Sequence, residues 1–180
     1  MKVYVMRHGQ TAWNAKGRIQ GWSESRLTDL GKAQAQDAAD KLKNVKIDLI
    51  FSSPLMRTMQ TANVVNQFHG VNIVKDKRII EKNAGIFSGK LESELDEKEL
   101  KLFKFGSKEC GVENRLDIYR RVNDFVKFLK TNYAEKNILI VTHYCVVKML
   151  VYCSENENWD ESVYEKIKAF GNAEVKQIVL

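Results

Sequence analysis

Three short runs of purely apolar residues, widely separated in the chain, constrain the fold most. They occupy residues 3–6, 49–51 and 138–141. Continuous apolar runs of this length, without polar alternation, are typical of strands buried on both faces of a parallel sheet. Long helical patterns lie between them. The sequence therefore predicts an α/β domain in which strands alternate with helices and the crossovers are right-handed.

Three helices and one further strand are predicted from patterning. The first helix spans 29–43, is rich in alanine, ends in lysines and has Thr28 as its cap. The second spans 55–68, with Ser53 as cap and Pro54 at the first helical position. The third spans 113–132 and carries an apolar stripe at helical spacing, formed by Ile118, Val122, Phe125, Val126 and Leu129.

Residues 174–180 are predicted to form a closing strand, and the polar pair Lys176–Gln177 places it at the edge of the sheet. The expected fold is a three-layer sandwich. Its central sheet is mostly parallel with one antiparallel edge strand, and helices cover both faces. The 180 residues contain no repeat or Pro/Gly-rich linker, so we expect one domain over 1–180.

Residues 90–112 interrupt the alternation, because they are densely charged and then aromatic. Two interpretations stay open. The segment is either an exposed helix with ion-paired faces or a lid that selects the substrate, since long insertions often carry specificity.

Composition narrows the classes of partner and compartment. The net charge of +6 favours anionic partners, but the basic residues are dispersed among acids, so nucleic-acid binding is not expected. No run of 18 apolar residues exists, so we expect no membrane association. The three cysteines are an odd number without a CxxC pair, and no signal peptide is recognisable at the start. These features predict a cytoplasmic protein with reduced thiols.

Polar side chains follow the predicted strands at the points where ligands bind in open parallel sheets. Arg7 and His8 follow the first apolar run, His143 follows the last, and Arg57 lies in the first turn of the helix after the second. Two of the three histidines thus fall at strand ends. We expect these four groups to converge on one pocket.

Their chemistry points to a phosphoryl group. Two guanidinium groups offer forks of donors that match phosphate oxygens, and the start of the helix near Pro54 would add free backbone N–H groups. An imidazole among cations is disfavoured from protonating, so His8 would stay a neutral nucleophile able to form a phosphohistidine. Because the arginines neutralise the oxygens, no metal or other cofactor is expected.

The segment Arg7-His8-Gly9-Gln10-Thr11 resembles the signature of the histidine phosphatase superfamily, which includes the cofactor-dependent phosphoglycerate mutases. The resemblance covers nearly the whole chain. The further matching positions, in chain order, are Asn14, Arg18, Gln20, Gly21, Leu27, Thr28, Gly31, Ser53, Pro54, Leu55, Arg57, Gln60, Thr61, Ala62, Glu81, Gly85, Gly89, Val141, Thr142 and His143.

The resemblance implies a role for each matching residue. His8 would be the phosphorylated nucleophile, with Arg7, Arg57 and His143 holding the phosphoryl group. Glu81 would protonate the leaving oxygen and later deprotonate water. The substrate-binding residues implied or suggested by these motifs are Asn14, Gln20, Thr11 and Tyr144. Tyr144 stands where the family often has glycine, so it could narrow the pocket or touch the substrate.

The sequence thus predicts a metal-independent phosphomonoesterase that acts on a small phosphorylated metabolite. A mutase-type phosphotransferase is the first alternative. The resemblance to the family favours hydrolysis over it, because the family's mutases are longer and have extra segments that close the site. A non-catalytic phosphate-binding protein is the second. The identity of the substrate and the oligomeric state are not readable from the sequence.

Overall fold

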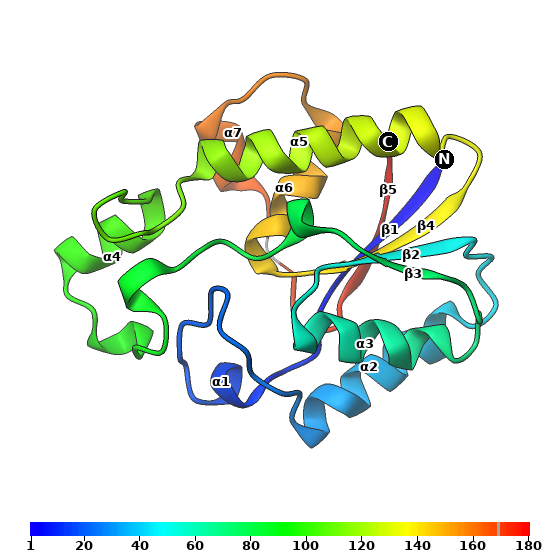
Figure 1. Cartoon of the computed structure of the whole chain (residues 1–180), viewed down its shortest axis with the longest axis horizontal. Coiled ribbons are helices and arrows are strands. Elements are labelled where there is room, and N and C mark those ends of the chain that lie inside the picture. The colour runs from blue at the N-terminus through cyan, green and yellow to red at the C-terminus, as the bar shows by residue number, and fades with distance from the viewer. Residues whose placement is uncertain (169) are drawn as a thin grey trace.

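A mixed five-stranded sheet forms the centre of the computed structural model, which describes residues 1–168 and 170–180 (Figure 1). The strand order is β3-β2-β4-β1-β5. The strands are β1 (Lys2–Arg7), β2 (Leu49–Ser52), β3 (Ile73–Lys75), β4 (Asn137–Thr142) and β5 (Val175–Val179). The pairings β1–β4, β2–β4 and β2–β3 are parallel, whereas β5 runs antiparallel to β1 at the edge. The predicted sheet and its antiparallel edge strand are confirmed, and only the short β3 was missed.

Seven α-helices are present among the described residues. They are α1 (Ala12–Ala15), α2 (Asp29–Leu42), α3 (Met56–Asn66), α4 (Glu97–Phe105), α5 (Arg115–Asn132), α6 (Tyr144–Glu155) and α7 (Glu161–Lys166). Short 3₁₀ turns at Lys77–Ile79, Gly85–Phe87 and Glu92–Glu94 interrupt the connection from β3 to α4. No described helix has both the length and the apolarity needed to cross a membrane.

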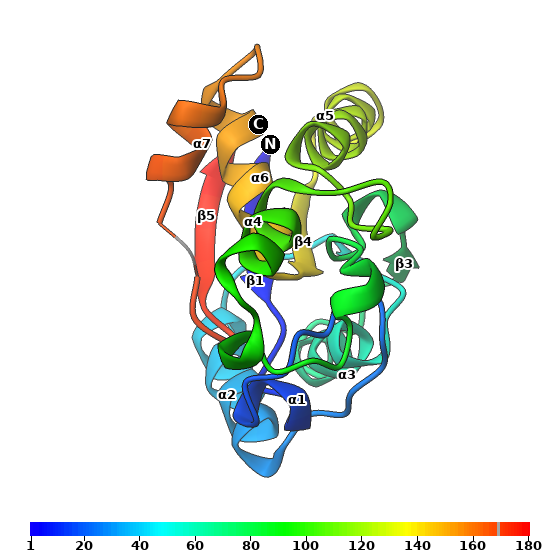
Figure 2. The same cartoon turned by 90° about the vertical axis from the view of Figure 1, so that its left-hand side faces the viewer.

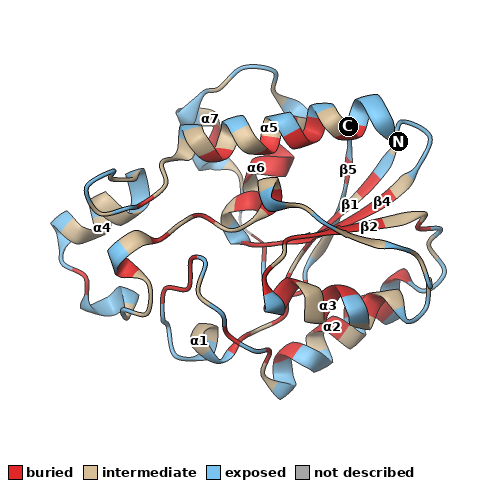
Figure 3. Ribbon diagram, viewed as in Figure 1, coloured by how far each residue is buried: buried red, intermediate tan, exposed pale blue. Residues whose placement is uncertain are grey.

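The sheet separates two apolar cores, because successive strand residues point to opposite faces. Val3, Val5 and Ile140 pack with α5 and α6, whereas Met6 and Leu139 pack with α2 and α3. Figures 1 and 2 show these helix pairs on opposite sides of the sheet, and Figure 3 shows the central strands largely buried. The three-layer arrangement is therefore confirmed.

The first and third predicted helices begin and pack largely as expected. The Thr28 hydroxyl accepts a hydrogen bond from the Gly31 N–H and caps α2. On α5, all five members of the predicted apolar stripe are buried in the core. The helix starts at Arg115, after Asn114 as its cap, two residues later than predicted.

The start of α3 corrects the prediction of a Ser53 cap with Pro54 at the first helical position. The helix begins at Met56, and its N-cap residue, Leu55, makes no side-chain cap. The Ser53 hydroxyl lies 2.7 Å from Nε2 of His143 instead. The Met56 N–H donates to the Glu24 carboxylate at 2.9 Å. The first N–H group of α3 is therefore engaged by a carboxylate.

The charged segment 90–112 combines features of both interpretations. It contains α4 at the carboxyl-terminal end of the parallel strands, the end where α1 also lies (Figure 1). One ion pair joins Lys90 and Glu99. Leu95 and Val112 bury apolar surface in a small separate cluster with Phe87. The segment therefore packs on its own core beside the end of the sheet where ligands bind in such folds.

Candidate active site

The carboxyl ends of β1, β2 and β4 border a cavity of about 850 Å³. Arg7 ends β1 and His8 follows it; Arg57 is the second residue of α3; His143 is the residue between β4 and α6. Arg7, His8 and Arg57 line the cavity, together with Glu81, Asn14, Gln20 and Tyr144. His143 lies behind them, with its ring centroid 5.3 Å from that of His8. Three of the four groups expected to converge thus line one cavity, whereas His143 lies beside His8 and does not line it.

His8 is held in a form suited to nucleophilic attack. Its Nδ1 lies 2.7 Å from the Gly9 carbonyl oxygen, and since a carbonyl only accepts, Nδ1 carries the proton. Nε2 then keeps its lone pair. Burial lowers the pKa of His8 well below its usual value, and the charges of Arg57 and Arg7 lower it further. The ring is therefore neutral around pH 7.

His143 has a protein partner at each ring nitrogen. Arg57 Nε donates to Nδ1 at 3.2 Å, so Nε2 carries the proton and donates to the Ser53 hydroxyl at 2.7 Å. The side chain is fully buried, and burial followed by the charge of Arg57 lowers its pKa. Both nitrogens are occupied and the ring does not line the cavity. This geometry favours orientation of Arg57 over the predicted direct contact with a phosphoryl group.

Arg57 is buried but only partly hydrogen-bonded. Besides the bond to His143, its terminal nitrogens donate to the carbonyl oxygens of Ser23 at 2.9 Å and Gly21 at 2.7 Å. Three of five N–H groups are used, and two remain for an anion. Burial lowers the pKa of Arg57 to about 10, well above neutral pH, so the group stays charged.

Arg7 also keeps donors available. One terminal nitrogen donates to the Phe170 carbonyl oxygen at 3.0 Å, and Nε is buried without a partner among the described residues. The guanidinium lies over the Tyr144 ring, 5.1 Å from its centroid. The segment that follows β1 is held by the C-terminal part of the chain, because Asn172 Nδ2 donates to the His8 carbonyl oxygen at 3.1 Å. The position of Arg7 is thus fixed while most of its donors stay free.

Glu81 presents its carboxylate to the same cavity. Its Oε1 accepts from the Lys82 N–H at 2.9 Å and from the Cys145 N–H, at the start of α6, at 3.3 Å. Its main-chain carbonyl oxygen accepts from Trp22 Nε1 at 2.6 Å and from Arg121 at 3.3 Å. Hydrogen bonds therefore hold both the side chain and the main chain of Glu81. Its second carboxylate oxygen, Oε2, forms no hydrogen bond to a described residue.

The other predicted binding residues separate into two groups. Asn14, Gln20 and Tyr144 line the cavity, and Gln20 Oε1 is buried without a described partner. Thr11 does not line it: the side chain is fully buried and accepts from the Asn14 N–H as the cap of α1. The structure therefore gives Thr11 a structural role in place of the predicted contact with substrate.

Several cavity residues were not anticipated from the sequence. Lys82, Lys104, Arg115 and Lys148 supply cations, and Phe103, Phe105 and Tyr164 supply aromatic surface. They come from five different segments, and lysine is frequent throughout the chain, so no spacing pattern marked them. Among residues 1–168 and 170–180, no three His, Cys, Asp or Glu side chains are placed to hold a metal ion.

Comparison with known proteins gives the geometry a family context. The chain is 32% identical over 160 residues to phosphoserine phosphatase 1 of Hydrogenobacter thermophilus, covering 86% of this chain and 75% of that protein. It is 42% identical over 99 residues to the probable phosphoglycerate mutase GpmB of Escherichia coli, covering 55% of this chain and 46% of that protein. A mycobacterial glucosyl-3-phosphoglycerate phosphatase in complex with VO3 superposes with a TM-score of 0.87 at 25% identity, covering 98% and 91% of the two chains.

The model of the histidine phosphatase superfamily (branch 1) matches residues 3–180, which is nearly the whole chain. The match includes the strand-end Arg–His pair and the second histidine. On this match and on the relatedness to phosphoserine phosphatase 1, the chain belongs to the histidine phosphatase superfamily, branch 1, as a phosphatase- or mutase-like enzyme.

Proposed function

We propose that the protein is a phosphomonoesterase that hydrolyses a small phosphorylated metabolite through a phosphohistidine on His8, without a metal ion. One observation carries the proposal: His8 is neutral, its Nδ1–H is anchored on Gly9, and its Nε2 faces a cavity that holds the free donors of Arg7 and Arg57. We also propose that residues 1–180 act as one domain.

In the first half-reaction, His8 Nε2 attacks phosphorus in line with the ester bond. The N–P bond forms as the P–O bond breaks, and the leaving alkoxide takes a proton from Glu81. Arg7 and Arg57 stabilise the charge on the equatorial oxygens, because their donors are already oriented toward the cavity. His143 is a positioning residue that holds Arg57 through Nδ1.

In the second half-reaction, water replaces the alcohol. The Glu81 carboxylate accepts a proton from water, whose oxygen attacks phosphorus while the P–N bond breaks. The products are inorganic phosphate and the free Nε2 lone pair of His8. Both half-reactions conserve protons, since Glu81 gives one and recovers one.

Transfer to a substrate hydroxyl, as in a mutase, is the competing function. GpmB, named a probable phosphoglycerate mutase, supports it, but that alignment covers only 55% of the chain. Phosphoserine phosphatase 1 aligns with 86% of the chain, and its name supports hydrolysis. We favour hydrolysis for that reason.

Hydrolysis of p-nitrophenyl phosphate with excess chelator tests the mechanism. We expect full activity with chelator and acid-labile phosphate on the wild-type protein, but neither turnover nor phosphoenzyme with His8→Ala. Loss of activity with chelator would refute the metal-free mechanism, and acid-labile phosphate on His8→Ala would refute the choice of nucleophile. Isomerisation of phosphoglycerate faster than phosphate release would establish the mutase function instead.

A further inference from the structure

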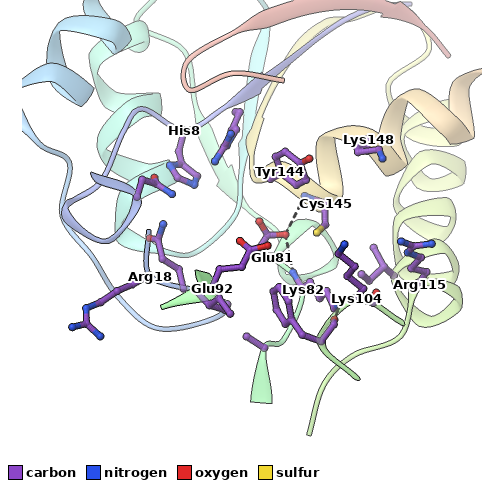
Figure 4. Close-up of a pocket in the computed structure, with 18 of the residues that line it drawn as sticks. His8, Arg18, Glu81, Lys82, Glu92, Lys104, Arg115, Tyr144, Cys145 and Lys148 are labelled. Carbon is purple, nitrogen blue, oxygen red and sulfur yellow. Dashed lines mark hydrogen bonds between the residues drawn. The ribbon is translucent and has the colours of Figure 1, made fainter. Parts of the chain in front are cut away.

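The cavity extends well beyond the groups that grip the phosphoryl group. Figure 4 shows Lys104, Arg115 and Lys148 gathered on the side of the pocket away from His8, with Glu81 and Cys145 between. Tyr144 begins α6 and lies against Arg7, whereas Lys148 is four residues further along that helix. Four residues advance a helix by about 6 Å, so Lys148 lies about one turn beyond Tyr144 along α6.

Two of the three cations, Lys148 and Arg115, lie against aromatic side chains. The Lys148 ammonium lies 4.6 Å from the centroid of Tyr164, and the Arg115 guanidinium lies 5.0 Å from that of Phe105 and 5.6 Å from that of Tyr164. Tyr164 is only 4% exposed. Aromatic faces attract cations but do not cancel their charge. The aromatic side chains therefore hold Lys148 and Arg115 in position and leave their charges available.

The carboxylates of the protein do not fully neutralise the charges of Lys104, Arg115 and Lys148. Glu161 and Glu165 both bind one terminal nitrogen of Arg115 at 2.8 Å, and they are about half exposed to solvent. Neither Lys104 nor Lys148 forms an ion pair with a described residue. Burial lowers the pKa of Lys148, and the nearby Arg115 charge also lowers it, whereas Cys145 and Glu165 act in the opposite direction. An anion bound between Lys148 and Arg115 would relieve the repulsion between these two cations.

The main chain around Lys104 is hydrogen-bonded to Lys82, the residue that follows Glu81. Lys82, which is 6% exposed, donates to the carbonyl oxygens of Phe103 and Lys104 at the end of α4. Its ammonium also lies 4.8 Å from the centroid of the Phe103 ring. The end of α4 is thus held against the loop that carries Glu81, and Lys104 is kept at the pocket.

We propose that Lys104, Arg115 and Lys148 form a second anion subsite, so that the substrate is an elongated phosphomonoester with a phosphate or carboxylate at its far end. The inference rests on the proposed function, because it places the scissile phosphate at His8. It also gives residues 90–112 a role in substrate selection, through Lys104.

Matched esters test the subsite. The probes are hexyl phosphate, 6-(phosphonooxy)hexanoate and hexane-1,6-diyl bisphosphate, which differ only in the group at the far end. We expect at least tenfold higher kcat/KM for an ester with a charged end, beyond the factor of two that two equivalent ends give the bisphosphate. The preferred end identifies phosphate or carboxylate. The preference should shrink as salt is raised, because exposed charges are screened.

Variants connect the preference to the named residues. Lys148→Met and Lys104→Met should each lower kcat/KM for the preferred ester at least tenfold more than for hexyl phosphate. Lys127→Met, an exposed lysine on α5 outside the cavity, is the matched control and should keep the preference. A preference that survives both variants would overturn the assignment of these residues.

Binding to His8→Ala, measured by calorimetry, separates the subsite from the chemistry. We expect a dissociation constant at least tenfold lower for the preferred charged-end ester than for hexyl phosphate. Equal affinity and equal kcat/KM for all three esters would overturn the subsite while leaving the phosphatase function intact. If the wild type hydrolyses none of them, nor p-nitrophenyl phosphate, but the affinity preference remains, then the proposed function fails and the subsite is supported.

Discussion

Replacing Arg57 with methionine should separate its contribution to stability from its contribution to catalysis. The guanidinium is 1% exposed and donates to His143 Nδ1 and to the carbonyl oxygens of Gly21 and Ser23. Methionine has a similar length and no charge. Removing the donors leaves two fully buried acceptors, His143 Nδ1 and the Gly21 oxygen, at a cost of about 1–3 kcal/mol each.

A second contribution has the opposite sign. Burial lowers the pKa of Arg57 from 12.5 to about 10, so the folded state disfavours the charged form by roughly 3 kcal/mol at 1.36 kcal/mol per pKa unit. That penalty disappears with the charge. The two contributions largely cancel, and we expect the free energy of unfolding to fall by no more than about 3 kcal/mol.

Catalysis has no such compensation. The two N–H groups of Arg57 that have no protein partner would stabilise the transition state, and removing one preorganised donor typically lowers kcat about 10²–10³-fold. The charge of Arg57 also lowers the pKa of His8. Without it, His8 binds its proton at higher pH, and protonation blocks the nucleophile. The acid limb of kcat/KM, which should lie below pH 6.5 in the wild type, should therefore move to higher pH.

Thermal unfolding and pH–rate profiles with p-nitrophenyl phosphate measure these quantities together. Arg120→Met is the matched control, because Arg120 is an exposed α5 residue whose one ion pair among the described residues is with the half-exposed Asp117, at 3.1 Å. It should leave both profiles unchanged. A rate loss below tenfold for Arg57→Met, with an unmoved acid limb, would refute the argument that Arg57 acts on the phosphoryl group and on His8.

Three further predictions concern the acid, a strained turn and the support of His143. Glu81→Gln should slow phosphoenzyme formation about 10²–10⁴-fold for alkyl phosphates and much less for p-nitrophenyl phosphate, whose leaving group needs no proton, whereas hydrolysis of the phosphoenzyme should slow equally with both; an equal loss in phosphoenzyme formation would reassign Glu81 to positioning. Gly85→Ala should lower the melting temperature strongly, because φ is +53° and a Cβ would lie 1.9 Å from the Cys110 carbonyl oxygen. Gly17→Ala is its control, since φ is +65° but nothing lies within 4 Å, and its cost should be only about 1–2 kcal/mol; similar melting temperatures for the two would contradict the steric argument. Ser53→Ala should destabilise the protein by about 1–3 kcal/mol in chemical unfolding, because the buried Nε2–H of His143 loses its partner at 2.7 Å, and no measurable change would mean that the hydrogen bond is absent.

Patterns that repeat along the chain were enough to predict the sheet and its main helices. The three apolar runs became β1, β2 and β4, since burial on both faces leaves no polar position in a strand. The stripe on α5 predicted its buried face because that face alone contacts the core. By contrast, α6 is apolar nearly all round, and such a segment has no periodicity that separates helix from strand.

Contacts between distant residues could not be predicted in the same way. The expected Ser53 cap was wrong because the hydroxyl pairs with His143, 90 residues away. The helix N-terminus that reaches the site belongs to α6, whose Cys145 N–H donates to Glu81, and not to α3, which Glu24 occupies. Such choices depend on which partner is nearest after folding, and local sequence does not contain that information.

The position of β1 within the sheet has a consequence for biosynthesis. Of the five strands, β1 is synthesised first, yet both of its hydrogen-bonding neighbours, β4 and β5, come from residues 137–142 and 175–179. The hydrophobic segment around Val3 and Val5 consequently has no paired strand on either edge until residues 137–142 have been synthesised. Nascent chains with unpaired strands are prone to intermolecular association. The yield of active enzyme should therefore rise with ribosome-associated chaperones and with a lower growth temperature.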